Sequence, residues 1–258
     1  MEIRNVDFQS FDVTKATPEV VQQYMKMFAE QLTKMPGNAP EYAVANSVEN
    51  PASPLKGKKI IFLGSSVMAG TMAMNESVCD YLQKEDGVIA YKEALAGTSM
   101  VDKDQMGPSF IKRMHTIPAD FEADLFVCQL STNDFSQNMP LGKIAESFDR
   151  KDFDTLTIAG AIEYIISYAR ETWQCPILFY SGTKFNGELY RQMVDLLLAI
   201  KEKWNINVLD LWNDVDLSTM EDSVYDLYMS DPIHPTRAGY KLWWTPFFRQ
   251  RLTELLVR

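Results

Sequence analysis

Four short stretches of the sequence hold polar groups of the kinds that acyl transfer uses. Between them they supply a hydroxyl, a glycine amide, a side-chain amide, a carboxylate and an imidazole. Transfer of an acyl group to a side chain needs a nucleophile, a base, an acid that orients the base, and donors for the oxyanion. The four stretches are Gly64–Val67 (GSSV), Ala96–Thr98 (AGT), Ser131–Asp134 (STND) and Ser230–Pro235 (SDPIHP).

Three residues of these stretches make a candidate catalytic triad. A serine such as Ser66 is a weak nucleophile at neutral pH unless a base removes its proton as it attacks. Histidine can take that proton and return it, and an aspartate bonded to the other ring nitrogen fixes the tautomer. Asp231 precedes His234 by three residues in a proline-flanked turn, so one loop could carry both. We therefore predict Ser66 as nucleophile, His234 as base and Asp231 as its orienting acid.

The chain contains two histidines, so the choice of base can be tested by elimination. His115 stands in IKRMHTIP, close to the expected end of a helix. A surface position or a C-terminal cap accounts for it without any chemistry. His234 is favoured because an aspartate stands three residues before it and the other polar stretches accompany it.

The elements that would position these groups alternate between two kinds. Short apolar runs that are typical of buried strands alternate with amphipathic helical segments, which predicts a parallel sheet covered on both faces, a three-layer α/β/α sandwich. In such sheets functional groups gather at the carboxyl ends of the strands, where the polar stretches stand. The expected strands are 59–64, 88–92, 124–131, 176–181 and 206–211, and the expected helices are 76–84, 158–173, 189–204 and 236–257, the last interrupted by Pro246.

Residues 1–57 form an N-terminal extension that we separate from a catalytic domain over residues 58–258. Thr17 and Pro18 favour the start of a helix, and Pro36-Gly37 its end. The apolar stripe of that helix requires a cover, either its own domain or another subunit of a homo-oligomer. The stripe consists of Val21, Tyr24, Met25, Phe28 and Leu32.

Composition excludes several classes of partner. A net charge of −10 without a basic stripe argues against nucleic acid and against an anionic membrane surface. The absence of a long apolar run argues against a membrane span, and the opening MEIRNVDFQS lacks the features of a secretory signal. Three widely spaced cysteines, Cys79, Cys128 and Cys175, are expected to be reduced thiols, without zinc-binding spacing. We expect a cytoplasmic protein that uses neither metal nor cofactor.

On these residues the sequence resembles the SGNH hydrolase family, also called GDSL-like lipases and esterases, over about residues 58–257. Gly64-Ser65-Ser66-Val67 is similar to the nucleophile motif Gly-Asp-Ser-Leu, and Asp231 and His234 match the Asp-x-x-His block. Gly97 matches the block II glycine and Asn133 the asparagine of the Gly-x-Asn-Asp block. The resemblance implies a flavodoxin-like fold with a five-stranded parallel sheet. It also implies an oxyanion hole made by the Ser66 and Gly97 amides and the Asn133 side chain.

Two departures from the family pattern leave the subfamily open. Ser65 replaces the usual aspartate before the nucleophile, and Ser131 replaces the glycine of block III. Neither residue supplies the core chemistry in the family, so we expect activity to survive. For Asn133, a purely structural role in the turn after the third strand is the alternative.

Other readings of the same residues differ in class. An α/β-hydrolase would need Gly-x-Ser-x-Gly, which Met68 breaks, and would separate the acid from the histidine more widely. A non-catalytic binding module on the same fold is the alternative outside enzymes. An acyltransferase would use the same residues with an alcohol in place of water.

The expected substrate is a small acyl ester, with an O-acetylated carbohydrate as the more specific alternative. Apolar residues near the polar stretches could line an acyl pocket, although ordinary core packing explains them equally well. These residues are Met68, Met100, Phe135, Met139 and Ile233, with Met72 and Met74 in the same loops.

Overall fold

A computed structural model describes residues 17–213 and 220–257. Its centre is a five-stranded sheet in which every strand pair is parallel and the strand order is β2-β1-β3-β4-β5. This is the strand order of flavodoxin-like folds, with a topological switch point between β1 and β3. The strands are β1 (Lys59–Gly64), β2 (Ile89–Ala94), β3 (Leu125–Gln129), β4 (Ile177–Tyr180) and β5 (Asn207–Leu209).

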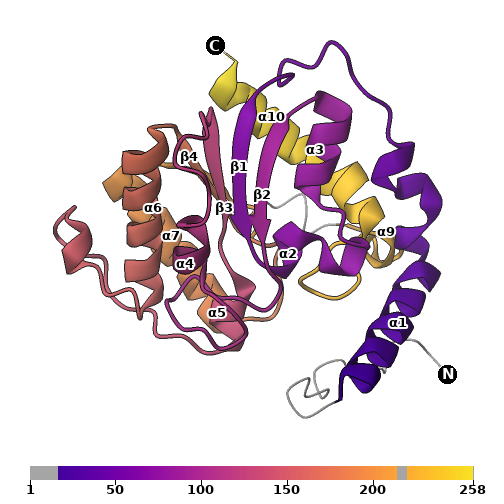
Figure 1. The fold of residues 1–258 in the computed structure, drawn as a ribbon, viewed down its shortest axis with the longest axis horizontal. Coiled ribbons are helices and arrows are strands. Elements are labelled where there is room, and N and C mark those ends of the chain that lie inside the picture. The colour runs from indigo at the N-terminus through magenta and orange to yellow at the C-terminus, as the bar shows by residue number, and fades with distance from the viewer. Residues whose placement is uncertain (1–16, 214–219, 258) are drawn as a thin grey trace.

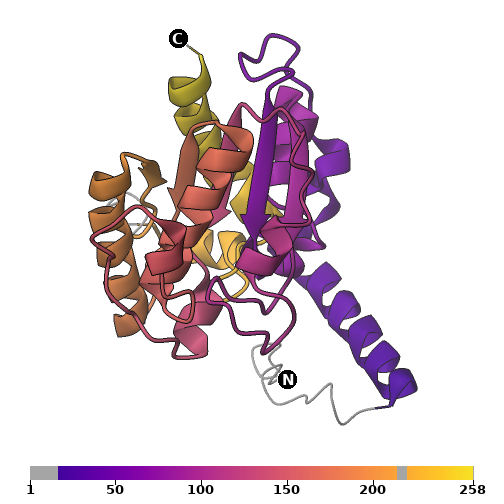
Figure 2. The same cartoon turned by 60° about the vertical axis from the view of Figure 1, so that its left-hand side comes forward.

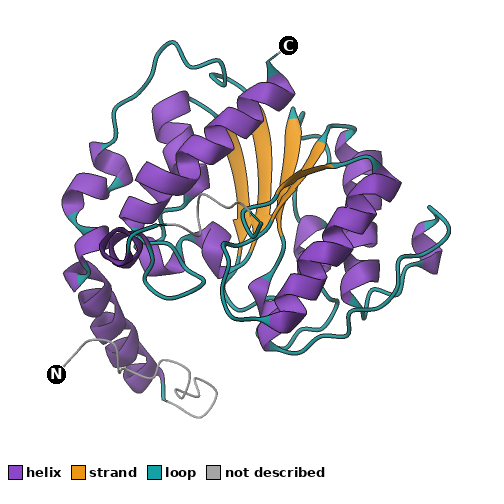
Figure 3. Ribbon diagram, turned by 180° about the vertical axis from the view of Figure 1, so that it is seen from behind, coloured by secondary structure: helices purple, strands orange, loops and turns teal. Residues whose placement is uncertain are grey.

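Helices cover both faces of the sheet (Figures 1 and 3), so the predicted three-layer α/β/α sandwich is confirmed. Helices α4, α6 and α7 lie on one face, and α3 and α10 on the other. The helices are α1 (Pro18–Lys34), α2 (Ser66–Ala69), α3 (Val78–Asp86), α4 (Phe110–Met114), α5 (Thr132–Ser136), α6 (Ile158–Trp173), α7 (Glu188–Trp204), α9 (Asp222–Tyr228) and α10 (Thr245–Leu256).

Alternation along the central strands divides the core into two layers. In β1, Ile61 and Leu63 pack with α4 and α6, whereas Ile60 and Phe62 pack with α3 and α10. Strand β3 alternates in the same way and is buried along its whole length. A central strand that is buried on both faces reads as a continuous apolar run, which is why these strands stand out in the sequence.

The C-terminal helical segment changes its hydrogen-bonding pattern ahead of Pro246. Residues Gly239–Trp244 form a π-helix, η8, and α10 begins at Thr245 with Pro246 in its first turn. Proline has no backbone N–H and its ring clashes with the carbonyl four residues earlier, so an ordinary α-helix cannot continue through it. The predicted interruption of this helix is therefore present, in the form of a π-helix.

Helix α1 projects away from the body of the molecule, as Figure 2 shows. Thr17 caps its first turn, and Met25 is 57% exposed while Leu32, near its end, is buried. The side chains of Val21 and Tyr24 lie outside the described residues. After α1, residues 36–46 form three short 3₁₀ turns, Pro36–Asn38, Pro40–Tyr42 and Val44–Asn46, that the sequence did not predict. None of the described helices is long and apolar enough to cross a membrane.

Candidate active site

The parallel sheet brings three of the polar stretches to one edge. Ser66 begins α2 directly after β1, Gly97 follows β2, and Asn133 lies in α5 directly after β3. Strand β1 lies between β2 and β3, so these residues follow the carboxyl ends of three adjacent strands. The fourth stretch, the histidine loop (residues 229–237), lies between α9 and the π-helix and is closed by an antiparallel bridge between Met229 and Pro235.

Ser66, His234 and Asp231 form a continuous line of hydrogen bonds. The Ser66 Oγ lies 2.8 Å from His234 Nε2, and His234 Nδ1 lies 2.8 Å from Asp231 Oδ2 and 3.0 Å from Oδ1. Ser66 is 8% exposed, and the imidazole is partly open to solvent. This geometry allows a proton to pass from the serine hydroxyl to the imidazole while the carboxylate holds the ring.

The Asp231 carboxylate also shapes the loop that carries it. Its Oδ1 accepts hydrogen bonds from the backbone N–H of Ile233 at 2.8 Å and of His234 at 2.9 Å. Burial raises the pKa of Asp231, but its hydrogen bonds with the His234 ring and these amides outweigh burial and lower the pKa below the ordinary value. The carboxylate is therefore ionised at neutral pH, where it can accept the Nδ1 proton of the imidazole.

The three oxyanion donors predicted from the sequence lie in the segments that follow β1, β2 and β3. Gly97 has a φ of +82°, a left-handed conformation that favours glycine. In residues 17–213 and 220–257, the backbone N–H groups of Ser66 and Gly97 donate to no protein acceptor. The Asn133 side chain donates one of its two amide hydrogens to the Thr98 carbonyl at 3.0 Å, which leaves the other for a ligand.

The block III loop holds two residues whose contacts were not predicted. Ser131, where the family has glycine, donates to the Thr98 carbonyl at 3.2 Å and accepts from the Asn133 N–H at 3.1 Å. Asp134 is fully buried and accepts from the backbone N–H of Met100 at 2.8 Å and of Val101 at 3.0 Å. Burial raises the pKa of Asp134 to about 6, although the hydrogen bonds from those amides act to lower it. Both residues thus fix the loop that carries Gly97.

Gln129, at the end of β3, binds the residues on either side of Ser66 and was missed by the sequence reasoning. Its Oε1 accepts from the N–H of Ser65 at 2.9 Å and of Met68 at 3.2 Å, while its Nε2 donates to Ser65 Oγ at 3.0 Å. Ser65 therefore forms hydrogen bonds with Gln129 at the position where the family has an aspartate. The available signal was a glutamine at the end of an otherwise apolar run.

Arg113 of α4 links the end of β1 to the loop that follows β2. Its guanidinium is buried and donates to the Gly64 carbonyl at 2.7 Å and to Thr98 Oγ1 at 3.0 Å. Glu93, at the end of β2, balances the charge at 3.1 Å. No motif in the sequence marked this arginine.

The residues predicted for an acyl pocket divide into two groups. Met68, Met100 and Met139 are packed into the core with at most 2% of their surface exposed. Phe135 and Ile233 are partly exposed, and the Phe135 ring lies 5.4 Å from that of Phe185. Core packing therefore describes these three methionines, whereas Phe135 and Ile233 keep part of their surface exposed.

His115 lies apart from the triad. Its Nε2 is 3.1 Å from the Tyr164 hydroxyl, and its ring packs on Tyr168 of α6 at 4.3 Å. Burial, with the nearby charge of Arg150, lowers the pKa of His115. Among the described residues, no group of three or more histidine, cysteine, aspartate or glutamate side chains is placed to hold a metal ion.

Comparison with known proteins relates this arrangement to one family. The sequence model of the GDSL-like lipase/acylhydrolase family matches residues 62–242, whereas no curated protein sequence matches the chain. A solved structure from Lactobacillus plantarum is similar with a TM-score of 0.64 at 20% identity, covering 77% of this chain and 98% of its own.

Two further solved structures carry names that refer to lipases or esterases. A Bacteroides ovatus protein classed as a GDSL-like lipase gives a TM-score of 0.56 at 16% identity, covering 77% of this chain and 99% of its own. A family two carbohydrate esterase from Clostridium thermocellum, solved with cellohexaose, gives 0.57 at 15% identity, covering 76% of this chain and 64% of its own. At these identities the similarity to solved structures is one of fold.

Proposed function

The chain belongs to the GDSL-like lipase/acylhydrolase family, and from that premise we propose that it is a serine-dependent ester hydrolase in which Ser66, His234 and Asp231 form the triad. The observation that supports this most is the hydrogen-bonded line from Ser66 Oγ through the His234 ring to Asp231, with 2.8 Å at each link. Fold and family alone would not specify which residues react.

In the proposed acylation step, Ser66 Oγ attacks the ester carbonyl carbon while His234 Nε2 takes the hydroxyl proton. The carbonyl oxygen gains the negative charge, which the Ser66 and Gly97 amides and the Asn133 side chain would stabilise. When the tetrahedral intermediate collapses, the carbon–oxygen bond to the alcohol breaks and His234 returns the proton to the leaving alkoxide. The products of this step are an alcohol and an acyl-serine.

Deacylation repeats the chemistry with water as the nucleophile. His234 removes a proton from water as its oxygen attacks the acyl carbon, and then protonates Ser66 Oγ as the acyl bond breaks. Asp231 stays ionised throughout and stabilises the transient imidazolium. A carboxylic acid leaves, and the free serine is restored.

We propose a small acyl group as the part of the substrate held next to Ser66. The packing of Met68, Met100 and Met139 into the core supports this, because these side chains do not offer a long apolar channel. The related fold of a carbohydrate esterase makes an O-acetylated carbohydrate the specific ester class to test first. Transfer to a sugar hydroxyl in place of water is the second candidate, since the same triad serves both reactions.

A rapid-mixing assay with p-nitrophenyl acetate tests this function. We expect a burst of p-nitrophenol of one equivalent per active enzyme, followed by slower turnover, because acyl-enzyme accumulates. His234→Ala should lose about 10⁴-fold or more in rate, as removal of a triad base does in serine hydrolases. His115→Ala is the matched control and should keep the wild-type burst.

An added sugar acceptor separates hydrolysis from transfer. A hydrolase should give the same steady-state rate and only acetate, whereas a transferase should turn over faster and acetylate the sugar. Equal rates for His234→Ala and the wild type would contradict the proposed base.

A further inference from the structure

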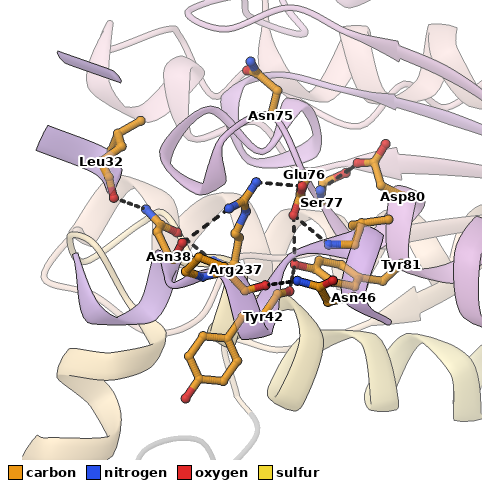
Figure 4. A network of polar contacts seen from close by, with 12 residues as sticks. Leu32, Asn38, Tyr42, Asn46, Asn75, Glu76, Ser77, Asp80, Tyr81 and Arg237 are labelled. Atoms are coloured by element: carbon orange, nitrogen blue, oxygen red, sulfur yellow. Dashed lines mark hydrogen bonds and ion pairs between the residues drawn. The ribbon is translucent and has the colours of Figure 1, made fainter. Parts of the chain in front are cut away.

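One buried side chain of the N-terminal segment, residues 36–46, contacts both catalytic loops. Asn38 is 3% exposed and contacts Arg237 of the histidine loop, as Figure 4 shows, and Met72 of the nucleophile loop (residues 64–75). This segment precedes the matched family region, which begins at residue 62. Its contacts are therefore an addition to the family's catalytic unit.

Both ends of the Asn38 amide are engaged. The Nδ2 group donates to the Met72 carbonyl at 2.9 Å and to the Leu32 carbonyl at 3.1 Å. The Oδ1 atom accepts from the backbone N–H of Arg237 at 3.0 Å, and the Asn38 carbonyl accepts from the Arg237 guanidinium at 3.3 Å. One side chain thus bridges Met72 and Arg237.

These two partners are close in sequence to the reacting atoms. Met72 lies in the turn that follows α2, the short helix that begins at Ser66. Arg237 comes three residues after His234. The relative position of the two loops sets the 2.8 Å distance between Ser66 Oγ and His234 Nε2. Asn38 therefore joins two loops whose relative position matters for proton transfer.

A partly buried ion pair strengthens the same junction. The Arg237 guanidinium donates to Glu76 Oε1 at 2.7 Å, and both side chains are less than one-fifth exposed. The other oxygen of Glu76 accepts from the Val44 N–H at 3.0 Å. Two residues before Val44, the Tyr42 carbonyl accepts a hydrogen bond from the Tyr81 hydroxyl at 2.7 Å (Figure 4). The segment is thus attached at several points between the two loops and α3.

Gly37 explains how the segment approaches so closely. A Cβ at this position would lie 2.0 Å from the Leu227 carbonyl oxygen and 2.4 Å from Thr236 Oγ1. Thr236 is part of the histidine loop, so any larger residue would push the segment away from it. The glycine next to Asn38 is therefore required by close packing.

We propose that Asn38 is a positioning residue for the reaction, whose side chain holds the histidine loop in register with the nucleophile loop. This inference rests on the proposed function, since it concerns the Ser66–His234 pair. Replacing Asn38 leaves the partly buried Met72 carbonyl and Arg237 N–H without their partner, and the loops relax to satisfy them. A misplacement of about 1 Å in a catalytic group can cost about 10²-fold in rate.

A second hydrogen bond between the two loop regions limits the loss of kcat expected when Asn38 is replaced. Tyr240, in the π-helix after the histidine loop, donates from its hydroxyl to the Val67 carbonyl of the nucleophile helix. The loops are therefore not released completely when Asn38 is removed. We expect Asn38→Ala to lower kcat by about 10- to 100-fold, with a much smaller change in KM.

The test compares Asn38→Ala and Asn38→Asp with Asn46→Ala in the full chain. Asn38→Asp keeps the acceptor for Arg237 but loses the donation to Met72, and it should also lower kcat. Asn46 is exposed and donates only within its own segment, to the Pro40 carbonyl, so Asn46→Ala should keep wild-type kcat. Circular dichroism and the thermal midpoint establish that each variant is folded at the assay temperature.

The outcomes separate this inference from the proposed function. Loss of kcat in both folded Asn38 variants, with Asn46→Ala normal and Ser66→Ala inactive, supports it. Normal kcat in folded Asn38 variants, despite a lowered thermal midpoint, overturns it and leaves the proposed triad intact, as does an equal loss in Asn46→Ala. Undiminished activity in Ser66→Ala would instead reject the proposed function.

Discussion

Replacing Ser66 with alanine should abolish ester turnover while the protein stays folded. The change removes the one oxygen that would form the bond to the acyl carbon and adds no bulk to a nearly buried site. Loss of a serine nucleophile costs about 10⁶-fold in kcat in a serine protease, which would place the variant at the assay background. Steady-state hydrolysis of a chromogenic acetyl ester measures the loss, and the thermal midpoint should stay close to that of the wild type.

A serine that is exposed on the surface provides the control. Ser223 is exposed in α9, so Ser223→Ala should leave both turnover and the thermal midpoint unchanged. Turnover in Ser66→Ala at the level of Ser223→Ala would show that another group attacks the ester.

Asn133→Ala should lower kcat by about 10²–10³-fold with little change in KM. The proposed bond from the Asn133 amide to the oxyanion would form mainly in the transition state, so its loss should affect kcat more than substrate binding. The amide also donates to the Thr98 carbonyl, so a modest fall in the thermal midpoint should accompany the kinetic effect. Measuring kcat and the thermal midpoint on the same preparation separates the two contributions.

Ser131→Ala offers a matched comparison because Ser131 donates to the same Thr98 carbonyl. It removes two hydrogen bonds within the loop, the one to the Thr98 carbonyl and the one from the Asn133 N–H, but no proposed oxyanion donor. We expect a thermal midpoint as low as that of Asn133→Ala with a much smaller loss of kcat. If the two variants lost kcat equally, Asn133 would act only through the turn after β3.

The sheet and the main helices could be predicted because their patterns are local. Strands β1 and β3 are buried on both faces and read as unbroken apolar runs, and α6 has the bounds that its periodicity predicts. The residues proposed for the triad were recognisable because each follows a strand or stands in a short loop with its partner. Their distances depend on strand order, which the βα alternation limits to few topologies.

The supporting residues could not be predicted because their partners are distant in sequence. Gln129 contacts Ser65 across 64 positions, and Asn38 contacts Arg237 across 199. Neither interaction leaves a periodic pattern, since each depends on one side chain reaching a backbone group of another loop. Met68 and Met100 illustrate the converse problem, because the sequence places them beside reactive stretches and the packing directs them into the core.

The assignment of the nucleophile is tested most directly by covalent labelling. A fluorophosphonate reacts with a serine only where a base activates the hydroxyl and donors stabilise the developing charge. After reaction with the intact protein, digestion and mass spectrometry should locate one phosphonyl group per chain, on Ser66, and none in Ser66→Ala. Labelling of Ser65, or stoichiometric labelling that persists in Ser66→Ala, would contradict the proposed active site.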